Sequence, residues 1–334
     1  MSKRERIKDK LKTRVGKGVL KECFFLFSLL VLVMIFFSLW GELRSEELTR
    51  FLFTENRAFE EKASPLILIF ILAFSHIGIS SFFIFVLFPA LFWMEKEKVA
   101  KKAALALLVA GGATFFLRQM TALPRPHFFD FNEPGYSFPS GHMVQIIVVM
   151  GFIAVCLQRR IISLLVGLLV VLAGISRLFF GFHFLDDIVA GIILGLILLY
   201  LFTKTILWIE KKEINFEVVV SILLLLGTPF FFYFLTGELA RHSHLLLYLT
   251  GLFVGYVLQK RYTQLPKADN LKERVIKTVI GIIVLINLVS LLPTEESSDG
   301  FTSSVYLFFG LFVSLIWNLL FCKLKILFKK IMSF

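Results

Sequence analysis

Charge and cysteine are both scarce in this sequence of 334 residues. Charged residues make up 18% of the chain and hydrophobic residues 57%, whereas a soluble domain is about a quarter charged. The cysteines Cys23, Cys156 and Cys322 each lie within or beside an apolar run, and no CxxC or Cys/His metal spacing occurs. These shortages argue against a disordered chain, a disulfide scaffold and a water-soluble globule. They point instead to a membrane protein.

Runs without charged residues mark the expected membrane spans. Roughly 20 apolar residues cross a bilayer as a helix, and lysine or arginine at the ends of a shorter run can reach the interface. We therefore predict an all-α, polytopic integral membrane protein with about ten transmembrane helices. The predicted spans are 23–41, 63–94, 103–117, 143–158, 161–176, 188–203, 218–237, 243–259, 278–294 and 300–322. The long second run is interpreted as one tilted or kinked helix.

Positive charge is distributed unequally between the segments that connect these spans. The chain has 36 Lys and Arg against 24 Asp and Glu, a net charge of +12. If the N-terminus is cytoplasmic and the spans alternate, 28 of the 36 basic residues fall on the cytoplasmic side, as the positive-inside rule requires. We therefore predict that both termini are cytoplasmic and that the protein resides in the inner or plasma membrane. We expect no nucleic-acid partner.

This topology divides the chain into two membrane parts. Residues 1–22 form a basic cytoplasmic N-terminus, and residues 23–203 hold six spans. Residues 204–217 form a cytoplasmic linker, and residues 218–334 hold a bundle of four spans. No small-residue cleavage site follows the run 23–41, so this run is interpreted as an uncleaved first span.

Polar residues gather in three segments on the predicted outer side. Residues 118–126 end the third span, residues 139–142 begin the fourth, and residues 176–187 connect the fifth to the sixth. Arg118, Arg125 and Arg177 in these segments oppose the positive-inside pattern, and charged residues at a membrane are candidates for function. The topology, derived from charge alone, brings all three segments to one face of the membrane.

Two histidines and a carboxylate in these segments favour phosphoryl transfer. His183 and Asp187 are four residues apart, so a helix would place both on one face. The carboxylate can then hold one imidazole nitrogen as N–H and leave the other to attack. His142 is a second imidazole, available as an acid or a base. We predict that His183, His142 and Asp187 are catalytic and form a phosphohistidine intermediate.

The same segments supply a site for a phosphate group. Arg118, Arg125 and Arg177 can bind a tetrahedral anion through charge-assisted hydrogen bonds. Ser140 offers a hydroxyl, and Gly141 lets the backbone approach the ligand closely. The backbone N–H groups at the start of the fourth span also favour an anion. Because the arginines supply the charge that a transition state needs, we predict neither a metal nor a cofactor.

The three segments resemble the motifs of the type 2 phosphatidic acid phosphatase superfamily. That family has KxxxxxxRP, PSGH and SRxxxxxHxxxD; this sequence reads RxxxxxxRP at 118–126, PSGH at 139–142 and SRxxxxxHxxxD at 176–187. Arg118 is the one departure, standing where the family most often has lysine; arginine keeps the charge but is bulkier. The resemblance covers about residues 20–203, with the six spans of the membrane lipid phosphate phosphatase branch. It does not explain residues 216–334.

The resemblance implies a role for each catalytic residue. His183 would be the nucleophile, Asp187 would orient it, and His142 would protonate the leaving alcohol and then activate water. The implied reaction is hydrolysis of a lipid phosphate or diphosphate at the periplasmic or extracellular face. Undecaprenyl diphosphate, phosphatidic acid, phosphatidylglycerol phosphate and the 1-phosphate of lipid A all suit such a site. A lipid phosphotransferase that uses the same histidine and a non-enzymatic lipid transporter remain as alternatives.

The C-terminal bundle carries few polar residues on its predicted outer side. An active site normally needs convergent titratable groups in one pocket, and residues 218–322 show none with a clear spacing. We expect this bundle to shape substrate access, to mediate homo-oligomer formation or to move lipid, without touching the phosphoryl group.

Overall fold

The computed structural model describes residues 64–126, 135–211, 238–263, 270–290 and 299–331, together with the single residues Thr54 and Val220. All regular structure in these ranges is helical, which confirms the all-α prediction. Four helices in them are long and apolar enough to cross a membrane, and a bent pair brings the number to five. The spans predicted at 23–41 and 218–237 lie outside these ranges, so the total of ten stays a prediction.

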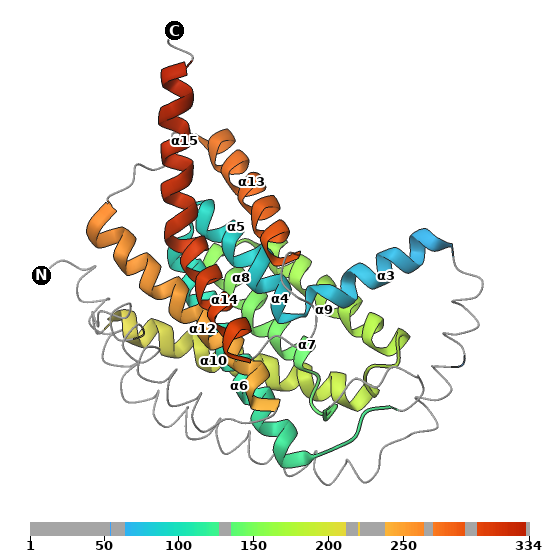
Figure 1. Ribbon diagram of the computed structural model, residues 1–334. Helices are drawn as coiled ribbons and strands as arrows, with labels where there is room; N and C mark the ends of the chain where they lie inside the picture. Colours follow the sequence, from blue (N-terminus) through green and yellow to red (C-terminus); the bar gives the residue numbers. More distant parts are fainter. Residues whose placement is uncertain are drawn as a thin grey trace, which may run out of the picture.

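In the first part of the chain, helix α6 contacts α5, α7, α8 and α10, and α3 lies against α9 (Figure 1). Helices α6, α9 and α10 extend past both ends of the charge-free runs that predicted them, because charged side chains at their ends can reach out of the apolar layer. The bounds are α3 Pro65–Ile77, α4 Ser80–Phe82, the π-helical turn η2 Phe83–Leu87, α5 Phe88–Trp93, α6 Glu97–Thr121, α7 Gly141–Gln145, the π-helical turn η3 Ile146–Met150, α8 Gly151–Leu157, α9 Arg160–Phe179 and α10 Leu185–Lys211.

The long apolar run at 63–94 is a broken helix. Its first half is α3, and its second half comprises α4, η2 and α5, which run without interruption. The two halves meet at an angle of 79°, with Gly78 and Ile79 between them. The run is therefore bent, and its single crossing of the membrane stays a prediction. The break directs α3 onto α9, while α5 packs on α6.

The C-terminal helices pack closely on one another. Their bounds are α12 Glu238–Leu258, the π-helical turn η4 Gln259–Thr263, α13 Leu271–Ser290, α14 Asp299–Leu311, the π-helical turn η5 Phe312–Ile316 and α15 Trp317–Ile331. Helices α12 and α14 cross at two glycines. A Cβ atom on Gly251 would lie 2.1 Å from the carbonyl oxygen of Leu307, and one on Gly310 would lie 2.1 Å from that of Tyr248. Only glycine allows two helix backbones to approach this closely.

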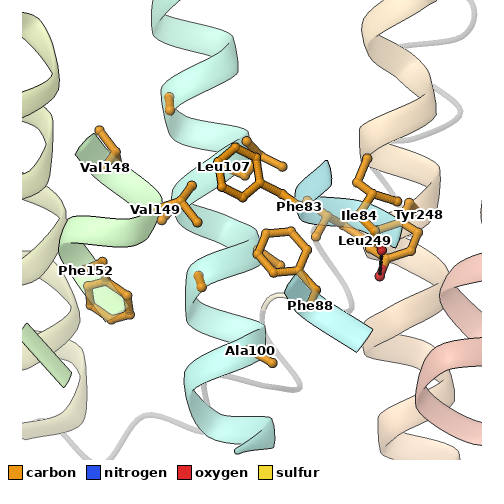
Figure 2. Packing of buried hydrophobic residues seen from close by; sticks show 14 of the residues in the cluster. Phe83, Ile84, Phe88, Ala100, Leu107, Val148, Val149, Phe152, Tyr248 and Leu249 are labelled. Carbon is orange, nitrogen blue, oxygen red and sulfur yellow. Dashed lines mark hydrogen bonds between the residues drawn. The ribbon is translucent and has the colours of Figure 1, made fainter. Parts of the chain in front are cut away.

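One continuous apolar core joins the C-terminal helices to the first part of the chain. Figure 2 shows Phe83 and Phe88, from the second half of the broken helix, in the space between α6 and α12. The Tyr248 hydroxyl of α12 donates a hydrogen bond to the Ile84 carbonyl, 3.0 Å away. The Trp93 indole N–H donates to the Val313 carbonyl at 2.9 Å. The second half of the broken helix is thus the element on which the C-terminal helices pack.

An ion pair and a cation–π contact reinforce this packing near the start of α6. Arg274 of α13 lies 2.9 Å from Glu95, which connects α5 to α6. Lys101 of α6 is 3% exposed, and its ammonium nitrogen lies 3.3 Å from the centre of the Tyr256 ring of α12. A buried cation requires such partners. These contacts lie at the N-terminal end of α6, whereas the arginine of its predicted motif lies at the other end.

Candidate active site

The three predicted motif segments meet at one end of the helix group. Arg118 lies in the last turns of α6, and Gly141 begins α7. Arg177 lies in the last turn of α9, and the turn from α9 to α10 carries His183. Helix α7 contacts α6, α9 and α10 (Figure 1). The chain therefore brings together residues that are up to about seventy positions apart in the sequence.

His183 and Asp187 form a buried pair. Their side chains are 1% and 0% exposed, and Nδ1 of His183 lies 3.4 Å from Oδ2 of Asp187. His183 precedes α10, which begins at Leu185, so the prediction that one helical face carries both residues is wrong in its geometry. The pair forms because Asp187 accepts the Phe184 N–H at 2.9 Å. This bond folds the turn back onto the first turn of the helix.

The imidazole of His142 faces this pair from α7. The ring centres of His142 and His183 lie 6.5 Å apart, with 65° between the ring planes. Nε2 of His142 is buried and has no hydrogen-bond partner. The separation allows one phosphoryl group to contact both imidazoles. A buried nitrogen without a partner favours such a ligand, because an unsatisfied polar atom destabilises the fold.

The start of α7 presents a hydroxyl and backbone donors to the same region. Ser140 is the N-cap of α7 and is fully buried. Its N–H donates to the Asp187 carbonyl at 2.9 Å, which ties the two motifs together. Its hydroxyl has no hydrogen-bond partner. A Cβ atom on Gly141 would lie 3.4 Å from Nη2 of Arg118, so this guanidinium lies directly beside the helix start.

Contacts with other segments of the chain hold each of the three predicted arginines. Nε of Arg118 donates to the Pro139 carbonyl at 3.2 Å. Nη1 of Arg125 donates to the Phe182 carbonyl at 3.3 Å. Arg177 is 3% exposed, and its guanidinium lies 4.9 Å from the centre of the Phe182 ring. The arginines thus have fixed positions around the two histidines.

The surroundings of His183 favour its neutral form. Burial, and after it the charges of Arg125, Arg118 and Arg177, hold the pKa of His183 well below its ordinary value of 6.5. Desolvation and nearby cations both disfavour a charged imidazole. A neutral imidazole has a free lone pair on one nitrogen, and this lone pair is what a nucleophile needs.

Three further residues at the site were not predicted from the sequence. Ser75 and Gly78, at the end of α3 and the break that follows, lie against Arg177 and His142. Gly191 of α10 lies beside the start of α7, where a Cβ atom would be 2.7 Å from the Ser140 carbonyl oxygen. Small residues within an apolar run carry no sequence signal for these contacts, because the run does not show which partner each of them faces.

The charge available at this site comes from arginine. In the part of the chain that the structure describes, no group of three His, Cys, Asp or Glu side chains is placed to hold a metal ion. The arrangement therefore consists of an anion site of guanidinium groups and helix N–H donors around two imidazoles, one of them paired with a carboxylate. Such a set can bind a phosphoryl group and transfer it.

Two stretches of the chain match models of known families. Residues 99–211 match the PAP2 superfamily, and residues 246–330 match the PAP2 superfamily phosphatase transmembrane extension. The first stretch contains all three motifs. The second covers most of α12 to α15.

The chain is similar to a protein sequence and to a crystal structure from Bacillus subtilis. Phosphatidylglycerophosphatase B of strain 168 is 32% identical over 143 residues, which cover 38% of this chain and 69% of that protein. A crystal structure of a transmembrane PAP2-type phosphatidylglycerolphosphate phosphatase covers 58% of this chain and 98% of its own, with a TM-score of 0.43 and 22% identity.

Proposed function

The chain belongs to the PAP2 superfamily, and on that premise we propose that it hydrolyses a lipid phosphate at the outer face of the membrane through a phosphohistidine on His183. It is an integral membrane protein of a phosphatase family. The observation that carries the proposal is the buried His183–Asp187 pair, which faces His142 and is surrounded by three arginines.

Phosphatidylglycerol phosphate is the first substrate to test. The relative that is 32% identical is a phosphatidylglycerophosphatase. The headgroup of phosphatidylglycerol phosphate ends in a phosphomonoester, which is the kind of group that this site fits. Undecaprenyl diphosphate, phosphatidic acid and the 1-phosphate of lipid A present the same terminal phosphate group. The residues that contact phosphate do not distinguish these lipids, so the choice depends on contacts with the rest of the headgroup.

In the first chemical step, His183 takes the phosphoryl group from the lipid. Asp187 lies beside Nδ1 and stabilises the proton on that nitrogen, so Nε2 carries the lone pair that attacks phosphorus. A bond forms between Nε2 and phosphorus, and the bond from phosphorus to the lipid oxygen breaks. The negative charge of the bound phosphate group favours the protonated form of His142, and this imidazolium donates a proton to the leaving oxygen. The products are the free lipid alcohol and phosphohistidine.

In the second step, water releases the phosphate. His142, now neutral, accepts a proton from a water molecule, and the water oxygen attacks phosphorus. The nitrogen–phosphorus bond breaks, inorganic phosphate leaves, and both histidines return to their starting states. Arg118, Arg125 and Arg177 stabilise the charge on the phosphoryl oxygens in both transition states. The Ser140 hydroxyl and the Gly141 N–H add donors at the start of α7.

Phosphate release from a panel of purified lipid phosphates tests this function. His183→Ala should lose nearly all turnover while the protein still inserts and folds, because covalent catalysis without its nucleophile should cost several kcal/mol. His76→Ala is the matched control, since His76 is an exposed histidine that bonds to the carbonyl of Leu72 in its own helix. A His183→Ala variant that keeps more than about a tenth of the wild-type rate would contradict the assigned nucleophile.

Adding a second lipid alcohol to the same assay tests the alternative acceptor. A lipid phosphotransferase would form a new lipid phosphate from that alcohol, whereas a hydrolase releases inorganic phosphate. Trapping of acid-labile phosphate on the wild-type protein, but not on His183→Ala, would support the intermediate that both reactions share.

Two single cysteines on α6 test on which side of the membrane the active site lies. Met120→Cys, near the end of the helix that carries Arg118, should be labelled from outside the cell. Lys98→Cys, in the first turn of the same helix, should be labelled only after the membrane is permeabilised. Both variants are made in a chain without its three native cysteines. The opposite pattern would place the site on the cytoplasmic side and contradict the topology drawn from charge.

A further inference from the structure

The break between α3 and α4 lies against the active site. Ser75, Gly78 and Ser80 are close to this break, and none of them belongs to the three motifs. Ser75 and Gly78 contact residues of the site on α9 and α7. Ser80 contacts a residue of α7 that lies one turn after His142. The 79° bend brings these three residues to the site from two different helices.

Ser75 holds the guanidinium of Arg177. Nη2 of Arg177 donates to the Ser75 hydroxyl at 2.6 Å and to the Ser75 carbonyl. Both residues are 3% exposed, so these acceptors replace water for a buried cation. Arginine is a long side chain with many rotamers. Two acceptors on one nitrogen therefore fix the direction in which the rest of the guanidinium faces.

Gly78 sets the position of His142. A Cβ atom at Gly78 would lie 2.7 Å from Cδ2 and 2.9 Å from Cβ of His142, distances at which side-chain atoms do not coexist. The ring of His142 therefore rests against bare backbone at the break. Ser80 adds a second contact between the break and α7. Its hydroxyl donates a hydrogen bond to Oε1 of Gln145 at 3.2 Å, and Gln145 lies one turn after His142 in α7.

We infer that the break is a fourth element of the active site, in which Ser75 positions Arg177 and Gly78 positions His142. The inference rests on the proposed function, since Arg177 and His142 act on the phosphoryl group only in that mechanism. A guanidinium displaced by a fraction of an ångström forms weaker bonds to a phosphoryl oxygen. A displaced imidazole no longer reaches the leaving oxygen.

Ser75→Ala tests the first contact, because it removes the hydroxyl and keeps the carbonyl. We expect kcat/KM for a short-chain soluble lipid phosphate to fall by about 10-fold, the effect of losing one hydrogen bond to a charged group. The affinity for vanadate, which mimics the pentacoordinate transition state, should fall by a similar factor. Ser81→Ala is the matched control, since Ser81 is an exposed serine of α4, and it should match the wild-type protein.

A double-variant cycle separates positioning from general destabilisation. In an Arg177→Lys background the hydrogen bonds to Ser75 are already changed, so adding Ser75→Ala should cost less than about 2-fold. If Ser75 only supports the fold, the two losses will instead multiply, and the positioning role will be contradicted.

Gly78→Ala tests the second contact through the leaving group. Protonation by a general acid matters for an alkyl leaving group and little for an aryl one. We therefore expect hydrolysis of the lipid phosphate to fall about 100-fold and that of an aryl phosphate about 10-fold or less. Gly112→Ala, where no atom lies within 4 Å of the added Cβ, is the control. Equal losses on both substrates would show that Gly78 does not act through His142.

The outcomes separate this inference from the proposed function. If the wild-type protein hydrolyses lipid phosphates and His183→Ala does not, while Ser75→Ala and Gly78→Ala match their controls, the inference alone is wrong. If the wild-type protein has no hydrolase activity, the proposed function is wrong. The thermal shift caused by vanadate in the wild-type and Ser75→Ala proteins then still measures whether Ser75 positions Arg177 for an oxyanion, and equal shifts would contradict this.

Discussion

Two buried polar groups at the candidate active site differ from the buried hydroxyl groups of the C-terminal helices. At the site, the Ser140 hydroxyl and Nε2 of His142 are buried without a hydrogen-bond partner. In the C-terminal helices, the buried Tyr248, Thr250 and Ser314 each donate to a backbone carbonyl. Both regions belong to the same bundle and share one apolar core.

This difference distinguishes polar groups that a ligand would satisfy from polar groups that stabilise the fold. A buried polar atom without a partner costs about 1–3 kcal/mol of folding free energy, so its retention at the site favours a ligand that satisfies it. A hydroxyl that already has a hydrogen-bond partner in the fold has no such cost in folding free energy, and its hydrogen bond adds to stability. Changes at the site should therefore lower activity and leave stability unchanged, whereas changes in the C-terminal helices should do the reverse.

The largest effect on activity outside the nucleophile is expected from Asp187→Asn. An amide beside Nδ1 favours the wrong imidazole tautomer and does not stabilise its proton, so turnover should fall by about 100-fold or more. The melting temperature in detergent should change little, because an amide oxygen can still accept the Phe184 N–H. Asp186→Asn, at the neighbouring position in the sequence, serves as the control. Activity near the wild-type level would remove Asp187 from the mechanism.

The largest effect on stability is expected from Gly251→Ala. The added Cβ would lie 2.1 Å from the Leu307 carbonyl oxygen, so α12 and α14 must separate, at a cost of about 1–3 kcal/mol. The melting temperature should fall, while kcat/KM per folded molecule stays within about 2-fold of the wild-type value. Gly167→Ala, which has no atom within 4 Å of the added Cβ, should change neither quantity. A selective loss of turnover would show that the C-terminal helices take part in the chemistry.

A smaller effect on stability is expected from Tyr248→Phe. It leaves the buried Ile84 carbonyl without its side-chain donor, which should lower the free energy of unfolding by about 1 kcal/mol. The control is Tyr262→Phe, since Tyr262 is 71% exposed. Both melting temperatures are measured in the same detergent. A loss of activity without a loss of stability would indicate instead that α12 acts on the site through the broken helix.

Removal of divalent ions is expected to have no effect on activity. Three arginines supply the charge around the two histidines, so activity in excess EDTA should equal activity without it. The control is the addition of magnesium to both samples. Activity that falls in EDTA and returns with magnesium would contradict the proposed mechanism, in which no step requires a metal.

The sequence predicted the motif residues and their common end, but not all of their geometry. Charge asymmetry and the order of apolar runs brought Arg118, Ser140 and His183 to one face, and the structure confirms that they meet. The spacing of His183 and Asp187 predicted their contact for the wrong reason, because His183 lies before the helix and not on it. A spacing of four residues is compatible with both geometries, and the sequence does not distinguish them.

The sequence alone determined the helical class, the membrane setting and the three segments that meet at the candidate site, because these depend on local composition and on spacing along the chain. The tertiary structure decided where the second apolar run breaks, that Ser75 faces Arg177 from 102 residues away, and that Tyr248 meets Ile84 across 164 residues. In a membrane protein nearly every face of a helix is apolar, so hydrophobic patterning does not specify which faces meet. Those pairings arise from the shapes of small and aromatic residues once the helices pack together.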